Sequence, residues 1–286
     1  MRSPSAHTKL VFLLGSPLGH TLSPVMHNRL FEKIGLDYLY LPVEVSDEDL
    51  EVVFAGLIRM NVAGFNVTIP HKVRIMEMLD ELDPLARVIG AVNTICVRDG
   101  RTKGYNTDGE GFVISLEKGL PGPIDGRRVF ILGCGGAARG VAMTLAHRGV
   151  SKIFLCNRTA TRAEVLADEI NTRVKPCAEA VPWDSRRMKA SLAGSDVLVN
   201  ATSVGMHPNE EAMPIDEELL FSRLAVADFV YNPPMTRLLK AARKRGCRIV
   251  NGQGMLVYQG ALAFKLWTGI EPIVEEMFAA LKVLQS

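Results

Sequence analysis

The sequence predicts an α/β protein built from two layered domains. Its 286 residues exceed the length at which a single domain is the usual expectation. Short apolar segments alternate with segments of helical periodicity along the chain, and this alternation favours parallel sheets covered by helices. A glycine-rich turn near residue 133 also joins an apolar segment to a helical one, as it does in sheets of this kind.

The first part of the chain contributes one set of alternating elements. The spacing predicts strand, helix, strand, helix and strand in that order, over residues 9–14, 23–34, 38–45, 46–59 and 62–67. Pro24 favours the start of the first helix, and Ser46 with Asp49 resembles a capping pair for the second. This order predicts parallel pairing of the three strands.

The second part of the chain repeats the alternation. Strands are expected over residues 128–132, 152–156, 196–200, 226–230 and 247–250, and helices over 137–148, 162–170, 236–245 and 254–267. Composition alone would put a domain boundary at residues 121–123, where proline and glycine are densest.

The composition excludes several classes of protein. With 48% hydrophobic residues and a net charge of only +2, the chain is neither a disordered segment nor a typical nucleic-acid-binding protein. The longest stretch without Asp, Glu, Lys, Arg or His, residues 249–264, is too short and too polar to span a membrane. The apolar segment near the N-terminus is too short for a signal peptide, so we expect a cytoplasmic protein.

Cysteine and histidine spacing argues against a metal. The five cysteines are widely separated and contain no C-x-x-C pair, which favours neither a disulfide framework nor a zinc site. The six histidines show no H-x-x-x-H spacing. No metal cofactor is therefore expected.

The glycine-rich turn predicts a dinucleotide site. It follows the strand over 128–132 and fits G-x-G-x-x-A, with the residues Gly133, Cys134, Gly135, Gly136, Ala137 and Ala138. The first glycine allows a tight turn, the second lets the backbone approach a pyrophosphate, and the last small residue lets the helix pack on the strand. The pattern predicts a Rossmann-like domain with the pyrophosphate at the helix N-terminus, the alternative being a tight turn without a ligand.

The end of the next strand favours NADP (NADPH) over NAD. NAD-selective sites usually have an acidic residue there, whereas this chain has Asn157, Arg158 and Thr159. A guanidinium can bind a 2′-phosphate with two hydrogen bonds, and Thr159 adds a hydroxyl. Such bonds predict a preference for NADP of about 10–100-fold. The alternative is that Arg158 is a solvated charge at a strand end.

Polar segments follow the strands of the first domain and suggest a substrate site. They are His20-Thr21-Leu22-Ser23-Pro24, Asn66-Val67-Thr68-Ile69-Pro70-His71-Lys72, Gly90-Ala91-Val92-Asn93-Thr94 and Gly104-Tyr105-Asn106-Thr107-Asp108-Gly109. Loops beyond the carboxyl ends of strands form the ligand crevice of an open α/β sheet. Hydroxyls, amides, one lysine and one aspartate suit a small, polyhydroxylated, anionic substrate, although turns and caps use the same residue types.

Together these segments closely resemble the shikimate dehydrogenase family, including its shikimate/quinate dehydrogenase branch. The resemblance runs from about Leu10 to Trp267 and includes the motifs Asn200-Ala201-Thr202-Ser203-Val204-Gly205-Met206, Asp228-Phe229-Val230-Tyr231-Asn232-Pro233 and Gly252-Gln253-Gly254-Met255-Leu256-Val257-Tyr258-Gln259. It implies the reversible, NADP-linked reduction of 3-dehydroshikimate to shikimate, on the route to chorismate and the aromatic amino acids. The alternatives are a dual quinate/shikimate dehydrogenase using NAD or NADP, and a non-catalytic NADPH-binding regulator.

The resemblance also implies roles for individual residues. Lys72 would be the catalytic acid/base, with Asp108 as a partner that binds a substrate hydroxyl. The substrate carboxylate would be held by Thr21 and Ser23, assisted by Tyr231, and the ring hydroxyls by Thr68, Asn93 and Gln259. Cofactor contacts would come from the residues 133–138 and 157–159 named above, the backbone of Phe229, and Gly252.

The family pattern implies a domain order and leaves the specificity open. Residues 1–108 and 253–286 would form the substrate domain and 109–252 the NADP-binding domain, with a cleft between them, in a monomer or homodimer. Thr21 stands where the family usually has serine, and Gln253 replaces a more commonly apolar residue. Pockets reject an added hydroxyl by only about 10² unless a clash is built, so both shikimate and quinate remain possible substrates.

The expected chemistry places a proton donor beside the substrate ketone. Negative charge develops on the ketone oxygen as hydride reaches the carbon, and an adjacent ammonium lowers that barrier. Asp108 close to Lys72 would favour the ammonium form. The reverse oxidation needs the neutral amine, so it is expected to be faster at alkaline pH.

Overall fold

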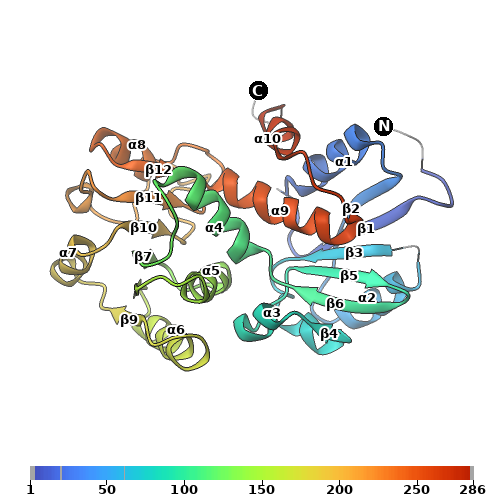
Figure 1. Cartoon of the computed structure of the whole chain (residues 1–286), viewed down its shortest axis with the longest axis horizontal. Coiled ribbons are helices and arrows are strands. Elements are labelled where there is room, and N and C mark those ends of the chain that lie inside the picture. The colour runs from blue at the N-terminus through green and yellow to red at the C-terminus, as the bar shows by residue number, and fades with distance from the viewer. Residues whose placement is uncertain (1–3, 20, 61, 284–286) are drawn as a thin grey trace. The chain divides into compact units, whose positions relative to one another are not determined.

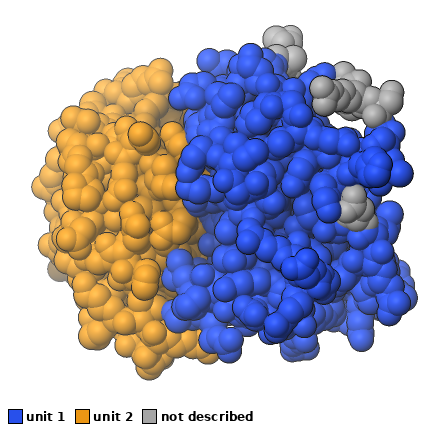
Figure 2. Space-filling model, turned by 45° about the vertical axis from the view of Figure 1, so that its right-hand side comes forward, with its two compact units in different colours: residues 1–107, 259–286 blue, residues 108–258 orange. Residues whose placement is uncertain are grey.

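The computed structural model describes residues 4–19, 21–60 and 62–283 and confirms the α/β fold class. The chain divides into two compact units (Figure 2). Unit 1 contains Met1–Thr107 and Gln259–Ser286, and unit 2 contains Asp108–Tyr258. Each unit has its own six-stranded sheet (Figure 1).

The sheet of unit 1 is mixed. Its order is β2-β1-β3-β5-β6-β4, with the strands β1 (Lys9–Gly15), β2 (Tyr38–Glu44), β3 (Val62–Val67), β4 (Glu81–Leu82), β5 (Thr94–Arg98) and β6 (Arg101–Tyr105). The parallel pairing expected for the first three strands is confirmed. Strand β5 runs antiparallel to both β3 and β6 and was not predicted. Its hairpin turn has positive φ at Asp99 and Gly100, as a type I′ turn requires.

Helices cover both faces of this sheet. Unit 1 contains α1 (Ser23–Ile34), α2 (Leu50–Ile58), the 3₁₀ turn η1 (Arg74–Met78), α3 (Pro84–Ile89), α10 (Val274–Val283) and the second half of α9 (Gly252–Thr268). Residues of α2, η1 and α3 share one core cluster with Phe65 of β3. On the other face, His27 of α1 lies against the rings of Tyr40 and Trp267, with centroids 4.7 and 5.2 Å away. The predicted first helix matches α1, which has Pro24 in its first turn and Gly35 at its C-cap.

The sheet of unit 2 is fully parallel and doubly wound. Its order is β12-β11-β10-β7-β8-β9, with β7 (Arg128–Leu132), β8 (Lys152–Cys156), β9 (Ala178–Val181), β10 (Val197–Asn200), β11 (Ala225–Asp228) and β12 (Arg248–Val250). The strand order therefore changes direction between β7 and β10. Dinucleotides bind outside the carboxyl ends of the strands at such a switch point.

Most helices of unit 2 differ from the expected segments only at their ends, whereas the helices over residues 108–119 and 185–193 were not predicted. The helices of this unit are α4 (Asp108–Gly119), α5 (Gly136–His147), α6 (Ala160–Arg173), α7 (Ser185–Ala193), α8 (Arg237–Lys244) and the start of α9, with the short 3₁₀ turn η2 (Glu217–Leu219). Helix α6 begins before residue 162 because Thr159 is in an extended conformation and serves as the N-cap. The strand expected over 226–230 ends at Asp228, because the N–H of Val230 bonds to that side chain.

Candidate active site

Three predicted substrate residues of unit 1, Thr21, Thr68 and Asn93, lie at one edge of its sheet. Strand β1 lies between β2 and β3, so the strand order changes direction beside it, and the loop residues Thr21 and Thr68 follow β1 and β3. Asn93 comes just before β5, which is antiparallel to β3. Its position at the amino end of β5 brings it to the carboxyl end of β3. These residues therefore lie at the edge where an open α/β sheet usually binds its ligand, beyond the carboxyl ends of the strands.

Lys72 lies in a turn that is held from two sides. Its backbone carbonyl accepts a hydrogen bond of 2.8 Å from the N–H of Val92. The neighbouring side chain, His71, is fully buried, with Nδ1 3.0 Å from a carboxylate oxygen of Asp47 and Nε2 2.8 Å from the carbonyl of Val45. The half-buried Lys72 thus projects from a fixed backbone. The supporting role of His71 was not predicted.

Asn93 fixes the point at which the chain leaves the sheet of unit 1. Its side chain is 3% exposed. Its Oδ1 accepts from the N–H of Thr107 at 2.7 Å, and its Nδ2 donates to the Thr107 hydroxyl at 3.0 Å. Thr107 is the last residue of unit 1, and Asp108 begins unit 2 as the first residue of α4.

Ser23 and Asn93 belong to one buried hydrogen-bond network. The Ser23 hydroxyl is bonded to that of Tyr40, and the Tyr40 hydroxyl donates to Oδ1 of Asn66 at 2.8 Å. The Asn66 amide donates in turn to the carbonyl of Asn93 and the hydroxyl of Thr94, both at 3.0 Å. Burial raises the pKa of Tyr40, so its hydroxyl keeps the proton that it donates. The linking role of Tyr40 and Asn66 has no signal in the sequence.

Thr21 and Gln259 complete the predicted substrate set in unit 1, and His20 of the same predicted segment lies outside the described residues. The N–H of Ser23 lies 3.4 Å from the Thr21 hydroxyl oxygen, which helps to begin α1. Gln259 is half-buried in α9, next to Gly260. A Cβ on Gly260 would lie 2.5 Å from Cε of Met26, so the absence of a side chain lets α9 approach α1 there.

The glycine-rich turn of unit 2 has the geometry that its sequence predicts. Gly133 has a φ of 95°, and a Cβ there would lie 2.9 Å from the carbonyl of Ala201. Apart from the adjoining residues and the backbone of α5 itself, no described atom comes within 4 Å of a Cβ placed on Gly135 or Gly136, so the space beside this backbone is open to a ligand. Helix α5 begins at Gly136, and Ala138 is fully buried.

The neighbouring strand end supports this turn. The Asn157 side chain follows β8 and accepts from the N–H of Cys134 at 3.2 Å, while its amide donates to the carbonyl of Thr159 at 2.9 Å. Arg158 and Thr159 are exposed beside it. Asn157 therefore holds the turn, and the two exposed residues are available to a ligand.

A groove of about 320 Å³ opens between the glycine-rich turn and α6. This volume is within the range of ligand pockets. The described residues that line it are Cys134, Gly135, Gly136, Arg139, Thr161, Arg162, Val165, Leu166 and Glu169. Arg139 is paired with Glu169, whereas Arg162 is exposed at the start of α6. Sequence reasoning missed Arg162, because a single arginine near a helix start resembles a solvated charge.

The loop after β11 approaches the start of α9 closely. The N–H of Gly252 bonds to the carbonyl of Val230 at 3.3 Å, and a side chain at Gly252 would collide with the carbonyl of Phe229. The Phe229 ring packs against Phe112 of α4, with centroids 5.1 Å apart. Tyr231 is half-buried, and burial raises the pKa of its hydroxyl.

The candidate residues thus form two sets, one in each unit. Unit 1 holds Thr21, Ser23, Thr68, Lys72, Asn93 and Gln259, and unit 2 holds Asp108, Tyr231 and all the expected cofactor residues. The pairing of Lys72 with Asp108, and that of Tyr231 with the two hydroxyls near α1, joins different units and stays a prediction.

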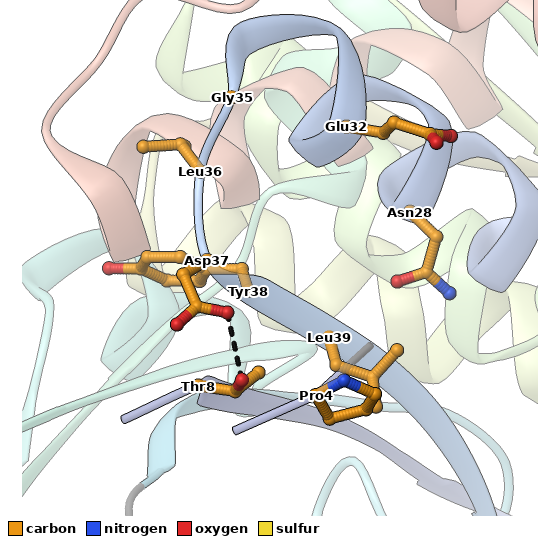
Figure 3. A pocket seen from close by; sticks show the side chains of 9 residues that line it. All are labelled: Pro4, Thr8, Asn28, Glu32, Gly35, Leu36, Asp37, Tyr38 and Leu39. Atoms are coloured by element: carbon orange, nitrogen blue, oxygen red, sulfur yellow. Dashed lines mark hydrogen bonds between the residues drawn. The ribbon is translucent and has the colours of Figure 1, made fainter. Parts of the chain in front are cut away.

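A smaller pocket in unit 1 is distinct from this edge (Figure 3). It lies at the opposite, amino ends of β1 and β2, where the Thr8 hydroxyl donates to Asp37 at 2.8 Å. Its volume of about 90 Å³ is well below that of a typical ligand pocket. In the described part of the chain, no group of three or more acidic, His or Cys side chains could hold a metal, and no helix could cross a membrane.

Comparisons with known proteins decide the family. Three family models match: the shikimate dehydrogenase substrate binding domain over residues 13–95, shikimate/quinate 5-dehydrogenase over 116–213, and the shikimate 5′-dehydrogenase C-terminal domain over 252–282. The shikimate dehydrogenase (NADP(+)) of Methanopyrus kandleri is 48% identical over 276 residues, which cover 96% of this chain and 95% of that protein. The chain belongs to the shikimate dehydrogenase family. It is therefore an oxidoreductase, and the family expected from its motifs is confirmed.

Solved structures of the shikimate dehydrogenase family share the fold. Shikimate 5-dehydrogenase from Listeria monocytogenes, in complex with shikimate and NAD, has a TM-score of 0.93 and 39% identity, covering 98% of this chain and 99% of its own. Quinate dehydrogenase from Corynebacterium glutamicum, in complex with NAD, has a TM-score of 0.89 and 34% identity, covering 96% and 99%. The expected two-domain, Rossmann-like α/β fold is confirmed.

Proposed function

We propose that this chain catalyses the reversible, NADP-linked reduction of 3-dehydroshikimate to shikimate. The observation that carries the proposal is the polar edge of unit 1. There Lys72 and Asn93 are held at the carboxyl end of β3, with the backbone of Lys72 bonded to Val92, the residue before Asn93. The Methanopyrus relative, at 48% identity, bears the name of this activity and this cofactor.

Lys72 would deliver the proton. When bound, NADPH supplies the hydride to the ketone carbon. The ammonium of Lys72 would donate its proton to the ketone oxygen as negative charge develops there, and it would recover a proton from solvent after each turnover. General acid catalysis of this kind contributes about 10²–10⁴-fold. The fixed turn around His71 supports this role, because it limits the positions from which the amine can act.

Asp108 would bind a substrate hydroxyl and orient the Lys72 amine. It directly follows Thr107, which Asn93 holds by two hydrogen bonds. A carboxylate held near an ammonium favours the charged amine, the form that donates during reduction. The reverse oxidation then requires the amine to lose a proton, so it should be faster at alkaline pH.

The substrate would lie on unit 1 and the cofactor on unit 2. The hydroxyls of Thr21 and Ser23 are suited to the carboxylate, with Tyr231 assisting, and Thr68, Asn93 and Gln259 to the ring hydroxyls. Residues 1–108 with 253–286 would serve the substrate and 109–252 the cofactor. The pyrophosphate would bind at the N-terminus of α5, where Gly135 and Gly136 leave the backbone open.

NADP would be preferred over NAD because arginine side chains are available at the end of β8. Arg158 and Thr159 follow that strand, and Arg162 lines the adjoining groove one helical turn later. Among the described residues of β8 and its following loop (152–159), none is acidic, so no carboxylate there repels a 2′-phosphate.

Dual use of quinate is a second candidate function. The residue that bears on it is Thr21, which keeps a hydroxyl where the family usually has serine and adds a methyl group beside the expected carboxylate site. Quinate carries an extra hydroxyl next to that carboxylate, and a pocket without a built clash discriminates by only about 10².

The direct test follows the absorbance of NADPH after addition of 3-dehydroshikimate or 3-dehydroquinate. Rapid loss with 3-dehydroshikimate supports the proposal, and comparable loss with 3-dehydroquinate supports dual use. Silence with both ketones, together with measurable NADPH binding, would overturn the proposal in favour of a non-catalytic NADPH-binding regulator.

A further inference from the structure

Asp228 is a buried carboxylate that accepts three hydrogen bonds at the carboxyl end of β11. It is 2% exposed. Its Oδ1 accepts from the Asn200 amide at 2.9 Å and from the N–H of Val230 at 3.0 Å. Its Oδ2 accepts from the Thr236 hydroxyl at 2.7 Å. One side chain therefore joins the ends of β10 and β11 to the start of α8.

Each of the three donors determines the course of a different loop. Asn200 ends β10, and its own Oδ1 accepts from the N–H and the hydroxyl of Thr202, which turns the chain after β10. The bond to Val230 spans two residues and bends the chain directly after β11. Thr236 is the N-cap of α8 and accepts from the N–H of Leu239 at 3.3 Å. Removing Asp228 would release all three segments.

The position of these loops in the sheet indicates which half of the cofactor would lie over them. The groove with Arg162 and the exposed Arg158 lie on the β8 side of β7, whereas β10 and β11 lie on the other side. A dinucleotide whose pyrophosphate sits at the N-terminus of α5 extends in both directions from the switch point. With the adenosine half near β8, the nicotinamide half extends over the loops that follow β10 and β11.

Packing alone does not explain a carboxylate at this position. A buried charge costs free energy, and a well-packed apolar side chain of similar size would avoid that cost. Burial raises the pKa of Asp228 to about 6, although the three hydrogen bonds act in the opposite direction. An apolar residue could not accept the three hydrogen bonds, so these bonds explain why a carboxylate is present.

We propose that Asp228 is a positioning residue for the nicotinamide half of the cofactor. It acts without touching the cofactor, by fixing the loops after β10 and β11. The carbonyl of Phe229, which lies between Asp228 and Val230 and packs tightly on Gly252, is the group that it most directly orients. The inference rests on the proposed function, because it assumes that NADP binds unit 2.

The test compares the affinities of Asp228→Ala for NADPH and for 2′,5′-ADP, which is the adenosine half alone. We expect NADPH to bind at least about tenfold more weakly, since three hydrogen bonds are lost, and 2′,5′-ADP to bind within about twofold of the unaltered protein. We expect a large decrease in kcat and only a small change in the KM for shikimate. Asp228→Asn should recover most of the loss, because its amide oxygen can still accept from Asn200 and Val230.

Asp184→Ala is the matched control. Asp184 is an exposed residue of unit 2 that caps α7 through a bond of 2.9 Å from the N–H of Arg187. It should leave both affinities unchanged. If Asp228→Ala does not fold, Thr236→Val removes one donor from the same carboxylate and should weaken NADPH selectively.

Three results separate the possible failures. Equal weakening of NADPH and 2′,5′-ADP, or no weakening of either, would overturn the role of Asp228 while leaving the proposed function intact. Asp228→Asn no better than Asp228→Ala would overturn the hydrogen-bonding account. Failure of the unaltered protein to bind 2′,5′-ADP or to oxidise shikimate would overturn the proposed function itself.

Discussion

The hydroxyl of Tyr40 and the amide oxygen of Asn66 share a buried hydrogen bond of 2.8 Å. Ser23 is bonded to the same hydroxyl, and the Asn66 amide donates to the backbone of Asn93. The residue proposed to hold the substrate carboxylate is thus connected to one proposed to hold a ring hydroxyl. Weakening this bond should affect substrate affinity before it affects the chemical step.

Tyr40→Phe tests the connection. It removes the hydroxyl and leaves buried oxygens of Ser23 and Asn66 without that partner, at a cost of about 1–3 kcal/mol in the free energy of unfolding. We expect the KM for shikimate to rise several-fold and kcat to change less. Tyr38→Phe is the control, since Tyr38 lies two residues before Tyr40 in β2 and lines the small pocket at the amino end of that strand (Figure 3). An unchanged KM in Tyr40→Phe, or an equal rise in both variants, would contradict the account.

Lys72→Ala tests the proton donor. Turnover should fall by about 10²–10⁴-fold, because the developing charge on the ketone oxygen loses its acid, whereas the Kd for NADPH should barely change. Steady-state kinetics and NADPH fluorescence measure the two quantities. Lys103→Ala is the control, because Lys103 is a lysine of the same unit, on β6, that faces Glu81 at 3.7 Å. Near-normal turnover in Lys72→Ala would remove this residue from the mechanism.

Arg158→Ala and Arg162→Ala test cofactor selection. Each should reduce kcat/KM for NADP by about 10–100-fold and leave the value for NAD nearly unchanged, because only NADP carries the 2′-phosphate. Arg173→Ala, at the far end of α6, should alter neither value. A parallel loss for NADP and NAD would show that the arginines support the fold and not the selection.

The free energy of unfolding should depend on pH because His27 is buried. Burial lowers its pKa from the ordinary value of 6.5 to about 3. Its contribution to stability is therefore complete above pH 6.5 and is lost as the pH falls toward 3, by about 1 kcal/mol per pH unit. Asp228, with its pKa raised from 3.8 to about 6, acts in the opposite sense, since its contribution is complete below pH 3.8 and is lost as the pH rises through 6.

The two groups are separated by comparing variants. His27→Phe should narrow the gap in unfolding free energy between pH 8 and pH 5 relative to the unaltered protein, whereas the exposed His147→Phe should not. Chemical denaturation at a series of pH values measures this. An unchanged gap in His27→Phe would mean that His27 is not held neutral by burial.

The sequence predicts the buried parallel strands most reliably. Strands β7 and β8 match their expected segments, because a strand buried on both faces is a nearly continuous apolar run. Strand β3 matches as well, although it contains the polar Asn66. The hairpin of β5 and β6 was missed, although Asp99-Gly100 is a strong turn signal, because β6 alternates exposed and buried residues over only five positions.

Part of the candidate active site could also be predicted from the sequence, because it follows from the order of the strands. Residues at the carboxyl ends of parallel strands meet at one edge of the sheet, so the sequence alone predicts that motif residues such as Lys72 lie near that edge. The networks around Tyr40 and Asp228 could not be predicted. Asn66 bonds to partners 26 and 28 residues away, and these meet only through the register of β3 against β5 and the packing of β2.

The measurement that tests the central claim most directly is steady-state kinetics with shikimate and quinate, each against NADP and NAD. The account predicts the highest kcat/KM for shikimate with NADP, and a value about 10–100-fold lower with NAD. It allows quinate to be used as well, within about 10² of shikimate. Absence of turnover of shikimate with either cofactor would contradict it.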